Sequence, residues 1–497
     1  MLVPDLLRSA AQAHPERVAV RIDGCGELTY GQWECDSNRF ARHLVERGIE
    51  PGSRVALSFS NLDGLLYLRC WFGIHKAGGV AVPTNPRATA RELEHVLAHA
   101  EVSLVLAGSE SADRLAGVLP PGAVLLRRSE VEAAWAEGES AEFQVPRPAD
   151  ALADILYTSG TTGLPKGVAC THENITFKGS SELHKYFQGA RYLHAVPLFT
   201  FAGSHAMTLM CLRGCMTQVI QPAFEPGRFL EILAEQKAAL SYAVPTMLLR
   251  CLEHPRLLEG GFDGLRLLMY GTAPMPPAAI QKLAQHFTGT FLVNLYGLTE
   301  GGAAVCTLPP QEALARPDSI GKPLPPTELK IVDEAGEELE AGLSGEICMK
   351  SVSTGRSYFR DEGATQKAWR DGWLHTGDIG YLDGDGYLYL VDRKKDLIIV
   401  GGHNVSAPEV EAALLDHPDV AEAAVIGLEH PGMGAVPRAF VVCRGEVSTH
   451  PEELQAFLEE RLVSYKVPRT YTFVDELPRN ALGKVLKREL RREGASA

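Results

Sequence analysis

A stretch rich in glycine and hydroxyl residues, 157–168, carries the side chains of this 497-residue sequence that most plainly suit a chemical task. Apolar residues 151–156 lead into it and residues 168–170 lead out, so the pattern predicts strand, loop and strand. Glycines let a loop turn sharply and bring its N–H groups close to a ligand. The groups suited to binding a polyphosphate are Thr158, Ser159, Gly160, Thr161, Thr162 and Lys166.

This stretch differs from the common P-loop, which needs Gly where Pro165 stands and a helix where Val168 begins an apolar run. Composition alone leaves a flexible polar hairpin loop as the alternative. Two further polar motifs follow apolar runs, at 271–274 and 297–300, and both runs read as buried strands. Because ligands of open α/β sheets bind at the carboxyl ends of strands, we expect these loops to share one pocket.

Elements that could position these loops alternate between helix and strand from the start of the chain. Amphipathic patterns at 4–14, 30–47 and 89–99 predict helices, and apolar runs at 54–59, 79–82 and 103–106 predict strands. Such alternation is typical of parallel βαβ units. We therefore predict an α/β protein: a large N-terminal domain, 1–392, of stacked doubly wound sheets with a β-rich lobe at about 319–390, and a small mobile α+β domain, 393–497.

Composition narrows the function classes. The 45% hydrophobic and 22% charged content is that of a globular protein, and the formal net charge of −14 argues against nucleic acid as a partner. The longest apolar stretch, near residues 65–82, is interrupted by charged and polar residues, so we expect no membrane partner. The N-terminus lacks a signal-peptide pattern, and we expect a cytoplasmic protein. The ten scattered cysteines form no metal-binding spacing.

Five motifs in order, at 157–168, 296–300, 372–380, 392–409 and 477–484, resemble those of the adenylate-forming superfamily. That superfamily comprises acyl- and aryl-CoA synthetases, nonribosomal-peptide adenylation domains and firefly luciferase, and the resemblance covers roughly residues 4–490. It implies two half-reactions: a carboxylate attacks the α-phosphate of ATP and releases pyrophosphate, and a thiol then displaces AMP to give a thioester.

The resemblance also implies a role for each matching residue. The loop at 158–166 would wrap the β- and γ-phosphates, Thr299 would contact the α-phosphate, and Glu300 would hold Mg²⁺, which prefers oxygen ligands. Asp378 would accept hydrogen bonds from the ribose hydroxyls with Arg393 beside it, and Tyr296 would pack on adenine. The remaining residues expected around AMP are Gly271, Thr272, Ala273, Asn294 and Gly297.

Lys484 matches the family's catalytic lysine, whose ammonium can bridge the carboxylate and the α-phosphate as charge develops. Lys395 occupies the position of the hinge about which the C-terminal domain rotates between half-reactions. After rotation, Gly401, Gly402 and His403 would line the thiol tunnel of coenzyme A. The acyl pocket is expected from Phe199, Thr200, Phe201, Gly203, Met247, Gly271 and Leu298.

Two departures from the family pattern concern the second half-reaction. Thr200 stands where the family often has His, and Ala435 stands where Glu is usual. The leading interpretation is an acid–CoA ligase that uses ATP, Mg²⁺ and coenzyme A on a medium-chain, aryl or bulky polycyclic acid. The alternative is an acyl-adenylate-forming enzyme that passes its acyl group to a carrier protein or a partner ligase in secondary metabolism. A carrier protein or a downstream acyltransferase is then the expected protein partner. A non-catalytic homologue is disfavoured because Lys484, Glu300 and Asp378 are all present.

Overall fold

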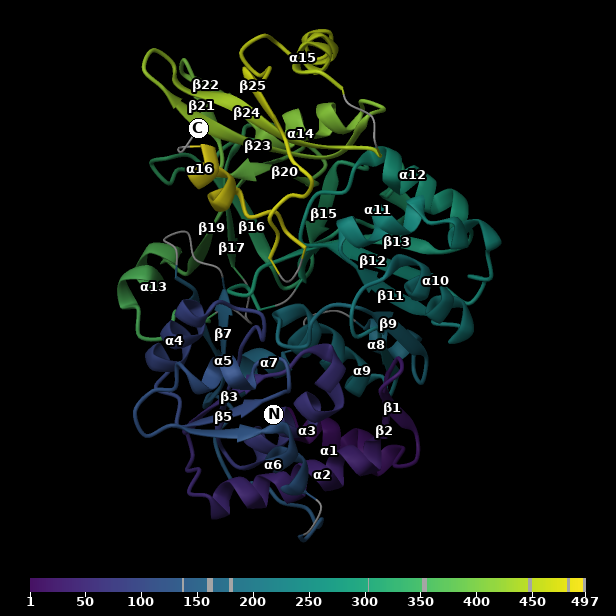
Figure 1. Ribbon diagram of the computed structural model, residues 1–497, viewed down its shortest axis with the longest axis vertical. Helices are drawn as coiled ribbons and strands as arrows, with labels where there is room; N and C mark the ends of the chain where they lie inside the picture. Colours follow the sequence, from purple (N-terminus) through teal and green to yellow (C-terminus); the bar gives the residue numbers. More distant parts are fainter. Residues whose placement is uncertain are drawn as a thin grey trace.

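The computed structural model describes residues 1–135, 138–158, 164–177, 182–302, 304–350, 355–445, 449–480 and 483–494. The described part of the chain builds three sheets (Figure 1). The first sheet runs in the order β6 (Val124–Arg127), β5 (Leu104–Ala107), β3 (Arg54–Ser58), β4 (Val80–Pro83), β7 (Leu152–Thr158) and β8 (Lys166–Thr171). Its strands are parallel except for β8, which runs antiparallel to β7.

Both faces of this first sheet are covered by helices, which explains why its strands are continuous apolar runs. On β3, Val55 and Leu57 belong to the core shared with α1 (Val3–Ala13), α2 (Tyr30–Glu46) and α3 (Gly64–Lys76). Ala56 points the other way, into a core shared with α4 (Ala90–His99) and α5 (Ala112–Ala116). The alternation of strand side chains thus fixes which helices lie on each face.

The second sheet is longer, and its parallel half follows the order β13 (Phe291–Gly297), β12 (Leu267–Gly271), β11 (Leu240–Ala243), β9 (Arg191–His194), β10 (Thr217–Ile220) and β1 (Val18–Ile22), with β2 (Gly26–Thr29) at the edge. Its helices are α10 (Pro226–Glu235), α11 (Pro245–Glu253) and α12 (Pro277–His286), with α9 (Leu209–Arg213) and the π-helix η2 (Ala202–Thr208). The strand β1 comes from the start of the chain and pairs in parallel with β10.

The β-rich lobe is part of this second sheet. From β13 the sheet continues antiparallel through β14 (Ala304–Thr307), β15 (Ser319–Pro323), β20 (Leu388–Arg393), β19 (Trp373–Leu382), β17 (Gly345–Lys350) and β16 (Glu328–Val332), and β18 (Trp369–Arg370) pairs with β19. The β-rich lobe expected at about 319–390 therefore belongs to the part of this sheet in which the strands pair antiparallel rather than parallel.

A third, small sheet holds β22 (His403–Val405), β21 (Ile398–Val400), β24 (Gly434–Cys443), β23 (Val420–His430) and β25 (Thr470–Phe473). Its helices are α14 (Ala407–Leu415), α15 (Pro451–Glu459) and α16 (Lys487–Gly494). β20 ends at Arg393 in the large sheet and β21 begins at Ile398 in the small one, so residues 394–397 join the two sheets, and the expected start of the C-terminal domain at 393 falls on the last residue of β20.

The shorter elements are α6 (Arg128–Ala133), α7 (His172–Thr176), α8 (Leu183–Tyr186), α13 (Glu362–Ala368) and the 3₁₀ turns η1 (Asn61–Asp63), η3 (Pro255–Glu259) and η4 (Pro310–Glu312). Within the described ranges, the helices are too short or too polar to cross a membrane. The chain is thus a large α/β body carrying a small α+β domain at its end, as the sequence predicts (Figure 1).

Candidate active site

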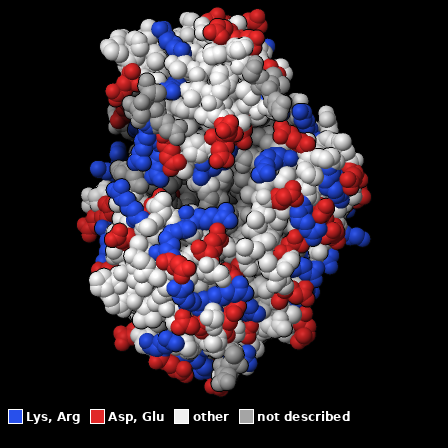
Figure 2. Space-filling model, in the orientation of Figure 1, with Lys and Arg blue, Asp and Glu red and all other residues white. Residues whose placement is uncertain are grey.

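A cavity of about 1370 Å³ lies where the small domain meets the large one. Figure 2 shows a hollow between the two parts of the molecule with Lys and Arg side chains beside it. Its walls come from the carboxyl ends of β7 and β13, from the loop after β9, and from β19, the hinge region and the loop before α16. The lining residues that the sequence singled out are Thr158, Lys166, Phe199, Thr200, Phe201, Thr272, Gly297, Leu298, Thr299, Glu300, Asp378, Arg393, Lys395 and Lys484.

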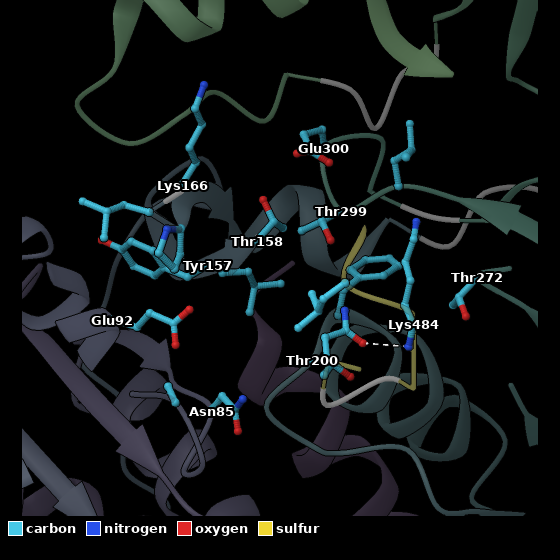
Figure 3. Close-up of a pocket in the computed structure, with 18 of the residues that line it drawn as sticks. Asn85, Glu92, Tyr157, Thr158, Lys166, Thr200, Thr272, Thr299, Glu300 and Lys484 are labelled. Atoms are coloured by element: carbon cyan, nitrogen blue, oxygen red, sulfur yellow. Dashed lines mark hydrogen bonds between the residues drawn. The ribbon is translucent and has the colours of Figure 1, made fainter. Parts of the chain in front are cut away.

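The two ends of the glycine-rich loop open into this cavity. Thr158 closes β7 and pairs with Lys166 at the start of β8, so the loop begins and ends at one point. The Lys166 ammonium lies 5.1 Å from the ring centroid of Tyr358, a cation–π contact. Ser159, Gly160, Thr161 and Thr162 lie outside the described residues. The described stem therefore brings one hydroxyl and one ammonium to the cavity (Figure 3).

A buried arginine fixes the backbone of the motif that carries Thr299 and Glu300. The Arg356 side chain is 1% exposed and donates to the carbonyls of Thr299, at 2.9 Å, and Gly302, at 3.4 Å. The Tyr358 hydroxyl donates to Oε1 of Glu300 at 2.9 Å, and burial raises the pKa of this phenol, so it stays a donor. A carboxylate with one donor keeps acceptor capacity, which suits a cation that also takes phosphate oxygens.

Asp378 is held by two neighbours and is 4% exposed. The Tyr296 hydroxyl donates to its Oδ2 at 2.6 Å, and Nε of Arg393 lies 3.4 Å from its Oδ1. Burial and the adjacent carboxylate raise the pKa of Tyr296, which keeps the phenol protonated as a donor. Tyr296 was expected beside adenine, yet it does not line the described cavity. Its hydroxyl instead orients the carboxylate of Asp378.

Lys484 reaches the cavity from a tight loop of the small domain. Its backbone N–H donates to Oδ1 of Asn480 and its carbonyl accepts from the Asn480 N–H, each at 2.9 Å. The preceding Gly483 has φ +76°, and a Cβ there would lie 3.0 Å from Oγ1 of Thr246 in the large domain. A glycine suits this backbone conformation and this close approach. The loop is thus packed against the large domain with the lysine in the cavity.

Burial lowers the pKa of Lys484 to about 8, and the nearby Arg393 guanidinium adds to the effect while Asp378 opposes it. Burial is also the main cause of a lowered pKa at Lys395, where Asp396 opposes the shift and Arg393 reinforces it. The site therefore gathers positive charge that is incompletely neutralised by the protein. Such a site favours an anionic ligand and stabilises negative charge that develops between two anions.

Besides Tyr296 and the thiol-tunnel residues described below, five more expected site residues do not line the cavity: Gly203, Met247, Gly271, Ala273 and Asn294. Gly271 is buried in β12, and a Cβ there would lie 2.1 Å from the carbonyl oxygen of Leu295 on β13. This glycine serves close strand pairing, and a larger residue at 271 would disrupt β12 and β13 before it filled a pocket. The next residue, Thr272, does line the cavity, with φ +73°.

One end of the cavity, expected to bind the acyl group and called the acyl end, is formed by side chains around the π-helix η2. Phe199, Thr200, Phe201 and Ala202 line the cavity there. Thr200 donates from Oγ1 to the Pro197 carbonyl at 2.7 Å and accepts from the Gly203 N–H at 3.2 Å, so its side chain starts the helix. A Cβ on Gly203 would lie 2.3 Å from the Pro197 carbonyl oxygen. Gly203 therefore shapes this end without lining it.

Phe201 contacts two polar groups. The Arg356 guanidinium lies 5.3 Å from the centroid of its ring, and the His205 ring lies 5.8 Å from it. His205 in turn places Nε2 2.5 Å from Oδ2 of Asp154, a fully buried carboxylate that also contacts Nε2 of His75 at 2.7 Å. This buried network supports the wall of the acyl end.

The expected thiol-tunnel residues Gly401, Gly402 and His403 form the exposed turn between β21 and β22. They do not line the cavity, and the His403 ring stacks on Tyr465 at 4.7 Å. In this arrangement of the domains, Lys484 occupies the site and the hairpin turn does not. Moving the turn to the site requires the small domain to rotate.

Several residues of the site escaped the sequence analysis. They are Arg356 and Tyr358 beside the Glu300 motif, Arg87, Arg91 and Glu92 at the start of α4, and Arg488 on α16. Arg87, Arg91 and Arg488 add cations to the arm of the cavity between α4 and α16. The apolar pattern of α4 and its Thr89–Glu92 capping box were visible in the sequence, but nothing there indicated which face meets the cavity.

The fold and the site define an enzyme that activates a carboxylate as an adenylate. Residues 7–359 match the sequence profile of the AMP-binding enzyme family, and residues 409–484 match the AMP-binding enzyme C-terminal domain. The chain belongs to the AMP-binding enzyme family. The resemblance to the adenylate-forming superfamily and the predicted α/β fold are thereby confirmed.

Relatives match over nearly the whole chain. A 2-succinylbenzoate–CoA ligase of Geobacillus sp. (strain WCH70) is 35% identical over 98% of this chain and 97% of its own length. A fatty acid–[acyl-carrier-protein] ligase of Streptomyces coeruleorubidus is 35% identical over 97% of this chain and 94% of its own. The structure of o-succinylbenzoate CoA synthetase from Bacillus subtilis with its acyl-adenylate intermediate is similar, with a TM-score of 0.86, 31% identity, and coverage of 99% and 98%.

Proposed function

We propose that the chain is an ATP-dependent carboxylic acid–CoA ligase that works through an acyl-adenylate. The observation that carries this proposal is the meeting of Lys484, Asp378, the Thr299–Glu300 motif and the stem of the glycine-rich loop in one cavity. Together they supply a ribose acceptor, phosphate donors and an ammonium between two anions. Such preorganised charge lowers the activation barrier for attack of the carboxylate on the α-phosphorus, and no protein nucleophile is needed.

In the first half-reaction the carboxylate attacks the α-phosphorus, and the bond to the pyrophosphate oxygen breaks. Lys484 holds the attacking carboxylate and the α-phosphate oxygen together, and Thr299 donates to the same phosphate. Glu300 would hold Mg²⁺, which would neutralise charge on the phosphates as pyrophosphate leaves. Asp378 fixes the ribose, and Thr158 and Lys166 bind the departing phosphates.

In the second half-reaction, the unit 393–497 rotates about Lys395, and the turn 401–403 replaces Lys484 at the site. The thiol of coenzyme A then forms a bond to the acyl carbon, and AMP leaves. The arm of the cavity lined by Arg87, Arg91 and Arg488 suits the phosphates of this cosubstrate by charge. ATP and coenzyme A are cytoplasmic metabolites, and we place the reaction in the cytoplasm.

The acid is an apolar one of medium-chain, aryl or polycyclic type. Phe199, Phe201, Ala202 and Leu298 supply an apolar wall at the acyl end. Among the relatives, one is named for a fatty acid, and two are named for 2-succinylbenzoate, an aromatic acid with two carboxyl groups. A mostly apolar pocket with few polar groups is the usual form of such a binding site.

A second candidate acceptor is the thiol of a carrier protein, from which a downstream acyltransferase would take the acyl group. Two observations support it: Thr200, where the family often has His, uses its hydroxyl in hydrogen bonds to the backbone of Pro197 and Gly203, and one relative is an acyl-carrier-protein ligase. The chemistry of adenylation is unchanged in this alternative. Only the thiol that displaces AMP differs.

The experiment is ATP–pyrophosphate exchange with a panel of carboxylic acids, followed by mass spectrometry with coenzyme A and with a phosphopantetheinylated carrier protein. Exchange with an apolar acid and an acyl-CoA product support the ligase. Exchange with acyl transfer to the carrier alone supports the second candidate. Absence of exchange with every acid, in the presence of Mg²⁺, contradicts both.

A further inference from the structure

Two histidines of helix α4 contact the two ends of the glycine-rich loop. His95 and His99 lie one helical turn apart, and their rings stack at 5.4 Å with 23° between the planes. Nε2 of His95 lies 3.0 Å from the carbonyl oxygen of Pro165, immediately before β8. Nδ1 of His99 lies 2.7 Å from the hydroxyl of Tyr157, immediately before the last residue of β7. One helix face thus grips both sides of the loop stem.

The chemistry of the partners decides which group can donate in each hydrogen bond. A peptide carbonyl only accepts, so Nε2 of His95 carries a proton and donates to Pro165. Burial raises the pKa of the Tyr157 phenol, which therefore keeps its proton. A phenol oxygen both donates and accepts, so the Tyr157 O–H donates to a bare Nδ1 of His99, and its oxygen accepts from a protonated Nδ1. We call the hydrogen bonds of His95 and His99 to the two loop ends the clasp.

The same helix also forms part of the cavity wall. Arg91, Glu92, Leu93 and Val96 line the cavity from α4, and Thr89 caps its first turn with a hydrogen bond from the Glu92 N–H. Figure 3 shows Glu92, Tyr157 and Lys166 on one side of the cavity. A capped helix is a rigid support. It can therefore set the position of the loop stem relative to the rest of the nucleotide site.

A second, small cavity of about 160 Å³ lies beside the two histidines, and His95, His99, Pro165, Lys166 and Asp361 are among its lining residues. The two hydrogen bonds join α4 to the loop ends, next to the apolar cluster in which Leu93, Val96 and Leu97 of α4 pack with Ile155 and Tyr157 of β7. Side chains of similar size can replace the histidines there without overpacking the core.

We propose that His95 and His99 are positioning residues for the polyphosphate of ATP, holding the two ends of the glycine-rich loop so that Thr158 and Lys166 face the cavity. The proposal rests on the proposed function, in which that loop binds the β- and γ-phosphates. It predicts a selective defect: binding of ATP weakens when the clasp is cut, whereas binding of AMP, which lacks those phosphates, is unchanged.

Variants that delete each hydrogen bond test the idea. His95→Leu and His99→Leu are each expected to weaken ATP binding about fivefold, the factor typical of one hydrogen bond. Tyr157→Phe should match His99→Leu, since both remove the same bond. His95→Gln retains an N–H donor and His99→Asn retains an acceptor, so both should recover affinity to within about twofold. His286→Gln, at the exposed end of α12, is the matched control.

The measurements are ATP and AMP binding by calorimetry, and the KM values for ATP and for the acid in pyrophosphate exchange. Equal loss of ATP and AMP binding, or a KM for the acid that changes as much as that for ATP, would overturn the proposal. Unchanged ATP binding in both Leu variants would overturn it as well. Because nucleotide binding needs no acid, failure of the clasp and failure of the ligase assignment give different results.

Discussion

The lowered pKa of Lys484 predicts how adenylation depends on pH. The shift from 10.5 to about 8 corresponds to a cost of about 3.4 kcal/mol for the charged form, at about 1.36 kcal/mol per pH unit. The charged fraction then falls from about 90% at pH 7 to about 10% at pH 9. Since kcat/KM reports on the free enzyme, its value for ATP in pyrophosphate exchange should fall about tenfold per pH unit above pH 9.

Two substitutions separate this lysine from other sources of an alkaline decline. Lys484→Arg keeps a positive charge throughout this range, so its rate, although lower, should lack the decline near pH 8. Lys484→Ala should lose about 10²- to 10³-fold or more in adenylation, as when one preorganised electrostatic group is removed, and should still form thioester from supplied acyl-adenylate. Lys282→Gln, on the exposed surface of α12, is the control and should retain the wild-type profile.

The reasoning is refuted by a wild-type profile that stays flat from pH 7 to 10, or by a Lys484→Arg profile that keeps the decline near pH 8. Equal loss of both half-reactions in Lys484→Ala would contradict the separate roles of the two domain arrangements.

Further predictions concern the ribose site, the domain contact and the core. Asp378→Asn removes a charge-assisted acceptor and should weaken AMP binding about 10- to 100-fold by calorimetry; unchanged affinity would exclude it from the ribose site. Arg444→Ala breaks the 2.7 Å ion pair with Glu253 across the domains. The rate of adenylation in steady-state kinetics should fall by less than about fivefold, and the difference from wild type should vanish in 0.5 M salt. Burial lowers the pKa of His194 to about 4, so between about pH 6.5 and 4 the unfolded chain binds a proton that the folded chain does not. The free energy of unfolding should therefore drop by up to about 1.4 kcal/mol per pH unit as the pH falls through that window, which denaturant titrations can measure. A His194→Gln variant with the same slope would contradict this.

Sequence patterns predicted the parts of this fold that depend on local periodicity. The helix predicted at 89–99, which is α4 (Ala90–His99), and the strand, loop and strand around the glycine-rich stretch follow from apolar spacing and turn residues. The pairing of strands that lie far apart in the sequence was not predicted, because no residue pattern within a strand shows which other strand its backbone bonds to. The pairing of β1 with β10, and the continuation of the second sheet into the lobe through β15 and β20, are of this kind.

The site shows the same division. Glu300, Asp378 and Lys484 lie in short motifs, and the structure brings them to one cavity. Arg356 was not predicted, because its role depends on burial against the carbonyls of Thr299 and Gly302. Gly271 was expected to line a pocket, because the sequence does not show whether the Cβ position of a glycine faces a cavity or a neighbouring strand. Its geometry toward Leu295 is a property of two adjacent strands.

The contrast between Gly271 and the acyl end has a consequence for how such a chain diversifies through evolution. At Gly271 every other residue would place a Cβ 2.1 Å from the Leu295 carbonyl oxygen, so a substitution there breaks the pairing of β12 with β13. Phe199, Phe201 and Ala202 present side chains to the cavity, and a change there alters the shape of a wall without breaking a strand pair. Descendants can therefore explore new acids by ordinary point mutation while inheriting the activation chemistry intact.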